Sequence, residues 1–100
     1  DISEYPSINR DLSFLIKNES KIAELESIVY TFNDPLLVDS FGFDFYNDPK
    51  TNYIKIGFRF VFQSGKKTLT DKEVDKVMSD IVESTLSLDD IEIPGIKHET

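Results

Sequence analysis

The spacing of hydrophobic residues along the chain predicts four strands. Residues 7–16, SINRDLSFLI, alternate between apolar and polar positions, and the alternation is cleanest over residues 53–63, YIKIGFRFVFQ. A period of two residues is typical of a strand with one buried face. Residues 36–46, LLVDSFGFDFY, form an aromatic-rich strand between these two. A short last strand is indicated by Leu86, Leu88, Ile91 and Ile93.

Two segments show helical spacing instead. Apolar residues recur at helical intervals from residue 22 to residue 32, and Asn18 offers an N-cap before them. Pro35 ends this helix, because proline disfavours a helical conformation in the residue before it. Thr70 and Glu73 match a capping box, in which a hydroxyl and a carboxylate three residues apart close the first turn of a second helix.

The second helix is predicted to end near residue 85. The predicted order of elements is therefore β-α-β-β-α-β, which is that of an α+β ferredoxin-like sandwich. In this fold a four-stranded antiparallel sheet carries two helices on one face. A chain of 100 residues is large enough for one hydrophobic core and too short for two domains. We therefore expect residues 1–100 to be a single domain with an ordered core of about 5–94. Because the chain lacks an initiator methionine, we expect it to be cut from a longer protein.

If the helices cover one face of the sheet, the apolar phase of each strand lies beneath them and the other phase looks outward. The predicted inward set is Phe41, Phe43 and Phe45 of the second strand and Ile54, Ile56, Phe58, Phe60 and Phe62 of the third. The predicted outward set is Gly42, Asp44 and Tyr46 of the second strand and Tyr53, Lys55, Gly57 and Arg59 of the third. We expect these two strands to pair, so that opposite outward side chains lie about 5 Å apart.

Charge is distributed unevenly along the chain. The formal net charge is −8, which argues against nonspecific binding of nucleic acid. Residues 49–70 nevertheless carry five basic residues and no acidic one, a local charge of +5 against −13 for the rest of the chain. Two interpretations fit this segregation: lysines on the wet side of a solvated strand, or a surface that binds nucleic acid.

The outward set would suit unstacked nucleotides. Aromatic rings stack on bases, cations hold phosphates, and a carboxylate accepts hydrogen bonds from a base edge. Asp44 is the selective member of the set, because guanine offers both an amino and an imino donor on its Watson–Crick edge. The alternative is that strand propensity alone places the tyrosines and that Asp44 forms a surface ion pair with a basic residue on the next strand.

The sequence shows no sign of catalysis or metal binding. It has no cysteine and a single histidine, His98, near the C-terminus, where a lone histidine is usually a solvated side chain. Neither phosphate-loop signature, GxxxxGKS/T or GxGxxG, occurs. No window approaches the ~18 apolar residues that span a bilayer. We therefore expect no catalytic residue, metal site or cofactor in this domain, and no membrane partner.

Four strings of residues lie in an order and spacing similar to those of a known family. They are YPSINRDLSF at 5–14, FDFY at 43–46, GFRF at 57–60 and TLTDKEV at 68–74. They resemble the ferredoxin-fold anticodon-binding domain of phenylalanyl-tRNA synthetases, which forms the C-terminus of the bacterial or plastid β subunit or of the single-chain organellar enzyme. Two features differ: Lys55 stands where the family commonly has serine, and residues 93–95, IPG, lack the arginine that often precedes the glycine.

The resemblance implies a function. Members of this family bind the anticodon stem-loop of tRNA(Phe) and position the tRNA for aminoacylation, which another part of the enzyme carries out. By the resemblance, Asp44 recognises the first anticodon base, guanine, and Tyr46 stacks nearby. ATP, magnesium and phenylalanine would belong to the parent enzyme, a phenylalanine–tRNA ligase. The implied partners are tRNA(Phe), the rest of the synthetase and its α subunit, in the cytoplasm of a bacterium or the interior of an organelle such as a plastid.

The resulting hypothesis assigns RNA contacts to eight residues. Asp44 reads the base, Tyr46 and Tyr53 stack, and the cations engage phosphates. These cations are Lys55, Arg59, Lys66, Lys67 and, at the start of the first strand, Arg10. Two other classes of protein stay open: a ferredoxin-like protein-interaction or small-ligand regulatory module without RNA binding, and a small acylphosphatase-type enzyme. The enzyme would need an arginine in a phosphate-cradling loop and a positioned asparagine, and no glycine-rich loop surrounds Arg10.

Overall fold

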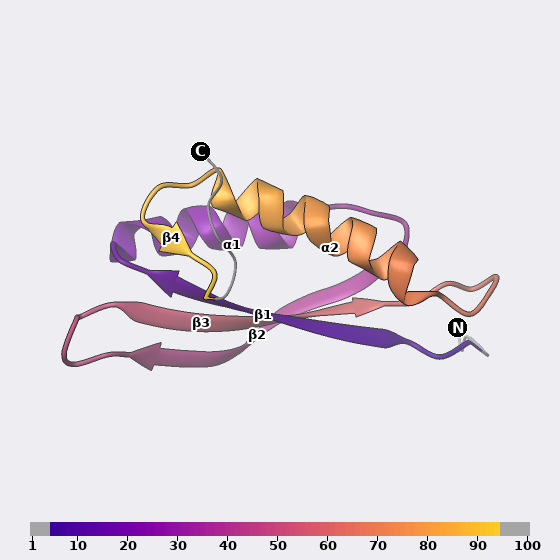
Figure 1. Cartoon of the computed structure of the whole chain (residues 1–100), viewed down its shortest axis with the longest axis horizontal. Helices are drawn as coiled ribbons and strands as arrows, with labels where there is room; N and C mark the ends of the chain where they lie inside the picture. Colours follow the sequence, from indigo (N-terminus) through magenta and orange to yellow (C-terminus); the bar gives the residue numbers. More distant parts are fainter. Residues whose placement is uncertain (1–4, 95–100) are drawn as a thin grey trace.

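A computed structural model describes residues 5–94 of the chain. The strands are β1 (Ile8–Ile16), β2 (Leu37–Asn47), β3 (Ile54–Phe62) and β4 (Ile91–Glu92). The helices are α1 (Ile22–Thr31) and α2 (Asp71–Leu86), with a short 3-10 helix, η1 (Glu19–Lys21), before α1. The strands form one antiparallel sheet in the order β2-β3-β1-β4, and α1 and α2 lie on one side of it (Figure 1). The predicted α+β ferredoxin-like sandwich is therefore confirmed.

The last strand is shorter than predicted. Because Leu86 continues the helical spacing, α2 runs through it, and β4 is only two residues long where it pairs with β1. Gly95 and His98 lie outside the described residues. Within the described part, neither helix has the length and apolar character that a membrane crossing requires.

Side-chain caps define where the helical segments begin. Asn18 Oδ1 accepts a hydrogen bond from the backbone N–H of Ser20 at 3.1 Å, so the asparagine caps η1, which leads directly into α1. Thr70 Oγ1 accepts from the Glu73 N–H at 3.2 Å, and Glu73 Oε1 accepts from the Thr70 N–H at 3.1 Å. This reciprocal pair is the predicted capping box, and it satisfies backbone donors that the start of α2 would otherwise leave unpaired.

The helix-facing side of β3 forms the centre of the core. Its five inward residues are all buried, as predicted: Ile54, Ile56, Phe58, Phe60 and Phe62. The helices contribute Leu25 and Val29 from α1 and Val74, Val77 and Ile81 from α2 to the same cluster. Phe58 also packs edge-to-face against Phe14 of β1, with 5.7 Å between the ring centroids. Since burial of apolar surface dominates the free energy of folding, this layer holds β3 and β1 as the rigid middle of the sheet.

The edge strand β2 departs from the prediction, because its pairing with β3 is irregular at two places. One of them lies between Gly42 and Asp44, where β2 holds one residue more than the strand opposite. Such a bulge shifts the alternation of side chains along the strand. As a result Gly42 lies opposite Phe58 on the helix side, and Phe41 lies opposite Arg59 on the other side.

Three predicted orientations in β2 are therefore wrong. Phe41 and Phe43 lie on the side away from the helices, and Gly42 lies on the helix side. The position of Phe43 follows from its contact with Gly57, since a Cβ built there, on the side away from the helices, would lie 2.8 Å from Phe43 Cζ. Phe43 and Asp44 are consecutive in β2 and both lie on the side away from the helices, because Phe43 is the extra residue of the bulge.

The C-terminal half of β2 follows the predicted sides. Asp44 and Tyr46 face away from the helices, opposite Gly57 and Lys55. Phe45 faces the helix side, opposite a buried isoleucine, but is 65 % exposed because β2 is an edge strand that the helices leave partly uncovered.

Removing the cap of α2 should destabilise the fold. We expect Thr70→Ala to lower the free energy of unfolding by about 1 kcal/mol, because the Glu73 N–H loses its side-chain acceptor. Thr68→Ala is the matched control, since Thr68 is exposed and lies outside the capping box, and its effect should stay within about 0.5 kcal/mol. Urea denaturation measures both. Equal losses from the two variants would contradict the assignment of the cap.

Candidate nucleic-acid interface

We call the side of the sheet that faces away from the helices the open face. Paired residues of antiparallel strands point to the same side, so the strand register gives the rows of side chains across it. Three neighbouring rows are Tyr46, Lys55 and Leu15; then Asp44, Gly57 and Ser13; then Phe41, Arg59 and Asp11. Four of the residues predicted to contact RNA, namely Asp44, Tyr46, Lys55 and Arg59, therefore share this surface.

Asp44 holds the middle row with an unpaired carboxylate. It lies opposite Gly57, which offers no charge, and no ion pair or side-chain hydrogen bond joins it to another described residue. The cross-strand ion pair that the sequence left open for Asp44 is thus absent from the described part of the chain. Asp44 is an exposed residue, so its carboxylate is available to accept hydrogen bonds from a ligand.

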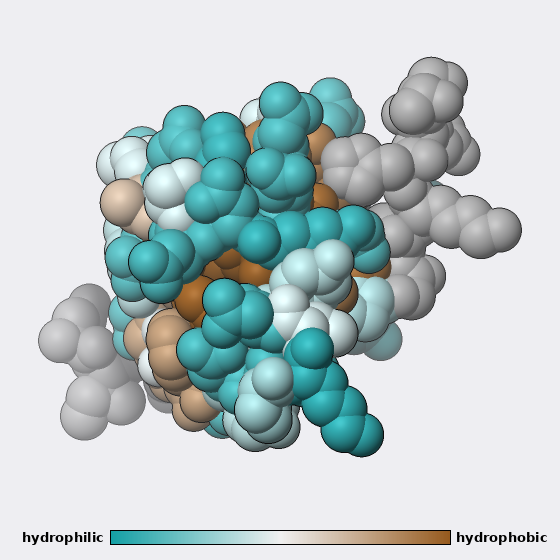
Figure 2. All heavy atoms as spheres, turned by 90° about the vertical axis from the view of Figure 1, so that its left-hand side faces the viewer, coloured by the Kyte–Doolittle hydropathy of each residue, from teal (hydrophilic) through white to brown (hydrophobic). Residues whose placement is uncertain are grey.

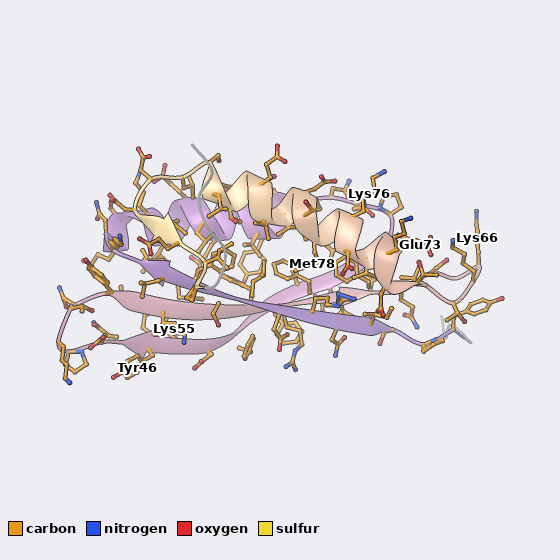
Figure 3. All side chains as sticks on the ribbon, in the orientation of Figure 1. Tyr46, Lys55, Lys66, Glu73, Lys76 and Met78 are labelled. Atoms are coloured by element: carbon orange, nitrogen blue, oxygen red, sulfur yellow. The ribbon has the colours of Figure 1, made fainter. Side chains whose placement is uncertain are left out.

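The first row of the open face carries a tyrosine and a lysine. Tyr46 lies directly opposite Lys55 and is 54 % exposed, and Figure 3 shows it on the side of the sheet away from the helices. Tyr53 precedes β3 at the end of the sheet and is only partly exposed, with Lys17 Nζ 6.0 Å from the centroid of its ring. Tyr46 therefore offers the more accessible ring for stacking.

Arg59 is held by an acidic partner on the open face. Its Nε and one Nη donate to the two carboxylate oxygens of Asp11 at 2.8 and 2.9 Å, a bidentate pair between β3 and β1. These hydrogen bonds hold the pKa of the Asp11 carboxyl below its ordinary value, and Asp11 in turn raises the pKa of Arg59. The Arg59 guanidinium carbon also lies 5.1 Å from the centroid of the Phe43 ring. Arg59 therefore organises neighbouring side chains on this face.

Arg10 lies away from the open face. It shares the phase of the apolar residues in β1, and its guanidinium donates to Asp75 at 2.9 Å and to Asp71 at 3.0 Å, both on α2. The structure thus separates Arg10 from the other candidates. Because it lies within a strand, it also lacks the loop that an acylphosphatase-type phosphate cradle would need.

The lysines of the two loops that flank β3 lie at opposite ends of the sheet. Lys66 and Lys67 are in the loop after β3, and Figure 3 shows Lys66 at the far end of the molecule from Tyr46. The nine residues of β3 span about 30 Å, so the two groups are well separated. Lys67 pairs with Glu73 and is the main cause of the lowered pKa of that carboxyl. Lys50, by contrast, lies in the loop joining β2 to β3, at the Tyr46 end, and the sequence hypothesis gave it no role.

Sequence reasoning missed two phenylalanines on the open face. Phe41 and Phe43 are 39 % and 47 % exposed there, on either side of Gly42. A lone glycine inside a strand pattern is a recognised sign of a bulge, so Gly42 carried the signal that could have corrected the phase.

Comparison with known proteins agrees with this geometry. Residues 3–89 match the family described as the ferredoxin-fold anticodon binding domain. The chain belongs to this family. Three similar proteins are phenylalanine–tRNA ligase β subunits: that of Bacteroides fragilis is 34 % identical over 84 % of the chain, the chloroplastic one of Phaeodactylum tricornutum 36 % over 79 %, and that of Xanthomonas euvesicatoria 33 % over 82 %. The chain spans only about a tenth of the length of these relatives, 10 %, 12 % and 11 % respectively.

The chain also has a groove on the helix side of the sheet. It is a hollow of about 340 Å³ between α1 and β2, with Ile22, Glu26 and Tyr30 on one wall and Gly42 and Phe45 on the other. Figure 2, which views the molecule from the end carrying the β2–β3 loop, shows hydrophobic atoms between the helix layer and the sheet. Among the described residues, no group of three or more histidine, cysteine, aspartate or glutamate side chains could hold a metal ion.

The ion pair on the open face predicts a pH dependence. A carboxyl whose pKa is lowered by folding stabilises the fold above its unfolded pKa, and this contribution is lost as the pH falls through the folded pKa. We expect Arg59→Gln to return the pKa of Asp11 toward its ordinary value of about 3.9, because the guanidinium hydrogen bonds are gone. NMR titration of the Asp11 side-chain carboxyl measures this change. An identical Asp11 titration in the wild type and in Arg59→Gln would contradict the assignment.

Proposed function

We propose that this domain binds the anticodon of tRNA(Phe) as the C-terminal domain of a phenylalanine–tRNA ligase β subunit. It positions the tRNA for aminoacylation that is carried out elsewhere in the enzyme. The observation that carries the proposal is the carboxylate of Asp44 on the open face, which has no partner among residues 5–94 and lies beside the exposed Tyr46 and Lys55. Membership of the anticodon-binding family and the names of the similar ligase subunits support it.

Each side chain of this group has a separate task. The two Asp44 oxygens accept hydrogen bonds from the imino and amino groups of guanine, the first anticodon base. The ring of Tyr46 stacks on a splayed base, and the ammonium of Lys55, directly opposite, neutralises a phosphate. Lys55 thus supplies charge at the position where the family commonly has a serine.

Within residues 5–94, few cations near the open face are free to bind phosphate, which limits the electrostatic part of the affinity. Arg59, Arg10 and Lys67 are already paired with acidic side chains. Lys55 and Lys50 remain at the Tyr46 end. If both contact phosphates, the logarithm of the binding constant should change with the logarithm of the salt concentration with a slope of about −1.4. The domain therefore contributes selectivity more than strength, and the parent enzyme supplies further tRNA contacts.

The other components of the reaction belong to the parent enzyme. ATP, magnesium and phenylalanine bind outside this domain, and the protein partners are the rest of the synthetase and its α subunit. The compartment is the bacterial cytoplasm or the interior of an organelle such as a plastid.

A protein-interaction module without RNA binding is the second candidate function. The groove between α1 and β2 favours it, since Tyr30 and Phe45 are exposed apolar side chains on its two walls. The acidic net charge of −8 also suits a protein partner better than RNA. Titration with an anticodon stem-loop separates the two candidates.

Loss of the Asp44 carboxylate should weaken binding to a tRNA(Phe) anticodon stem-loop. We expect Asp44→Ala to raise the Kd roughly 5- to 150-fold, the cost of losing a bidentate contact to a base edge, with little effect on folding. The matched control is Asp39→Ala, which removes the same charge from the same strand and face, opposite Val61. Fluorescence anisotropy over a range of salt concentrations measures both.

The base itself provides a second test of the same contact. Inosine in place of the first anticodon guanine removes the amino donor, so it should weaken the wild type and leave Asp44→Ala almost unchanged. If the wild type shows no salt-dependent binding to the guanine stem-loop, RNA binding by this domain is refuted.

A further inference from the structure

We propose that Phe43 and Arg59 form a second stacking platform, which takes the base of the nucleotide next to the one read by Asp44. The inference rests on the proposed function, since it adds a subsite to the same RNA-binding face. Its chemistry is the stacking of a base on a ring and a guanidinium. No base-edge donor or acceptor is required of the platform, so it should accept any of the four bases.

The bulge in β2 places Phe43 where a base could reach it. Without the extra residue, Phe43 and Asp44 would alternate between the two sides of the sheet. With it, both lie on the open face, and Phe43 extends across β3 above Gly57. A Cβ at Gly57 would lie 2.8 Å from Phe43 Cζ, so only glycine at this position leaves room for the ring. Even so, Phe43 is 47 % exposed, and its ring covers backbone rather than the hydrophobic core.

Arg59 is fixed over the ring of Phe43. Its guanidinium carbon lies 5.1 Å from the ring centroid, and Asp11 binds the guanidinium through two hydrogen bonds of 2.8 and 2.9 Å. A side chain that is already ordered loses less conformational entropy when a ligand binds. Asp11 also balances the charge of Arg59, which directs the pair toward stacking on a base rather than toward holding a phosphate.

The ring of Phe43 lies in the row of Asp44, above Gly57 and toward Arg59. Tyr46 lies one row away on the other side, opposite Lys55. Lys55 and Gly57 are two residues apart on β3, which is about 7 Å along the strand. Two bases splayed from one strand could therefore stack separately, the first on Tyr46 with its edge on Asp44 and the second on Phe43.

The experiment uses anticodon stem-loops with 2-aminopurine at the nucleotide on either side of the first anticodon base. Emission of this purine falls when it stacks, so wild-type domain should quench one of the two probes. Phe43→Leu keeps an apolar side chain but removes the ring, and it should abolish that quenching and raise the Kd roughly 5- to 150-fold. Phe43→Tyr keeps the ring and should retain both properties.

Two further variants separate the platform from general effects on the fold. Phe45→Leu makes the same change two residues away on the other side of the sheet, and it should leave quenching and Kd unchanged. Gly57→Ala keeps Phe43 but forces its ring aside and, less closely, crowds Asp44, so it should lose quenching as Phe43→Leu does. Thermal unfolding followed by circular dichroism checks that each variant folds.

The outcomes distinguish this inference from the proposed function. If Phe43→Leu binds and quenches like Phe45→Leu while Asp44→Ala still weakens binding, the platform is refuted and the function stands. If the wild type binds neither stem-loop, both fail together. The second subsite would be established if one probe is quenched by the wild type and by Phe43→Tyr. The same quenching must disappear in Phe43→Leu and Gly57→Ala.

Discussion

Between Gly42 and Asp44, β2 contains one residue more than the strand with which it pairs, and the composition of the open face depends on that extra residue. It brings Phe43 and Asp44 to the same side in succession, an aromatic ring beside an unpaired carboxylate. A regular strand would have sent one of them toward the helices. The bulge is tolerated because β2 is an edge strand, where a local break in pairing disturbs only one neighbour.

The distribution of ion pairs reconciles an acidic chain with a proposed RNA-binding role. Three of the six cations in residues 49–70 and β1 are neutralised at short range: Arg59 by Asp11, Arg10 by two aspartates of α2, and Lys67 by Glu73. Exposed pairs of this kind contribute little to stability, but they fix where the side chains point. Free positive charge is thereby confined to a few lysines, and selectivity rests on hydrogen bonding and stacking.

Features that depend on local sequence were predictable, and those that depend on strand pairing were not. The capping box at Thr70 and the burial of every second residue in β3 follow from residues close together in the chain. The bulge depends on how β2 and β3 align, which alternation in one strand does not encode, although Gly42 hinted at it. The phase of Arg10 likewise pointed to the helix side, but its aspartate partners on α2 are more than sixty residues away in the sequence.

The contact between Gly57 and Phe43 has a consequence for how these positions change over evolution. The two residues belong to different strands and occupy one volume, because the ring of Phe43 takes the space that a side chain at position 57 would fill. A larger residue at position 57 is therefore compatible only with a smaller one at position 43, or with a displaced ring. The two positions should therefore covary, with an aromatic residue at 43 expected only where position 57 is glycine.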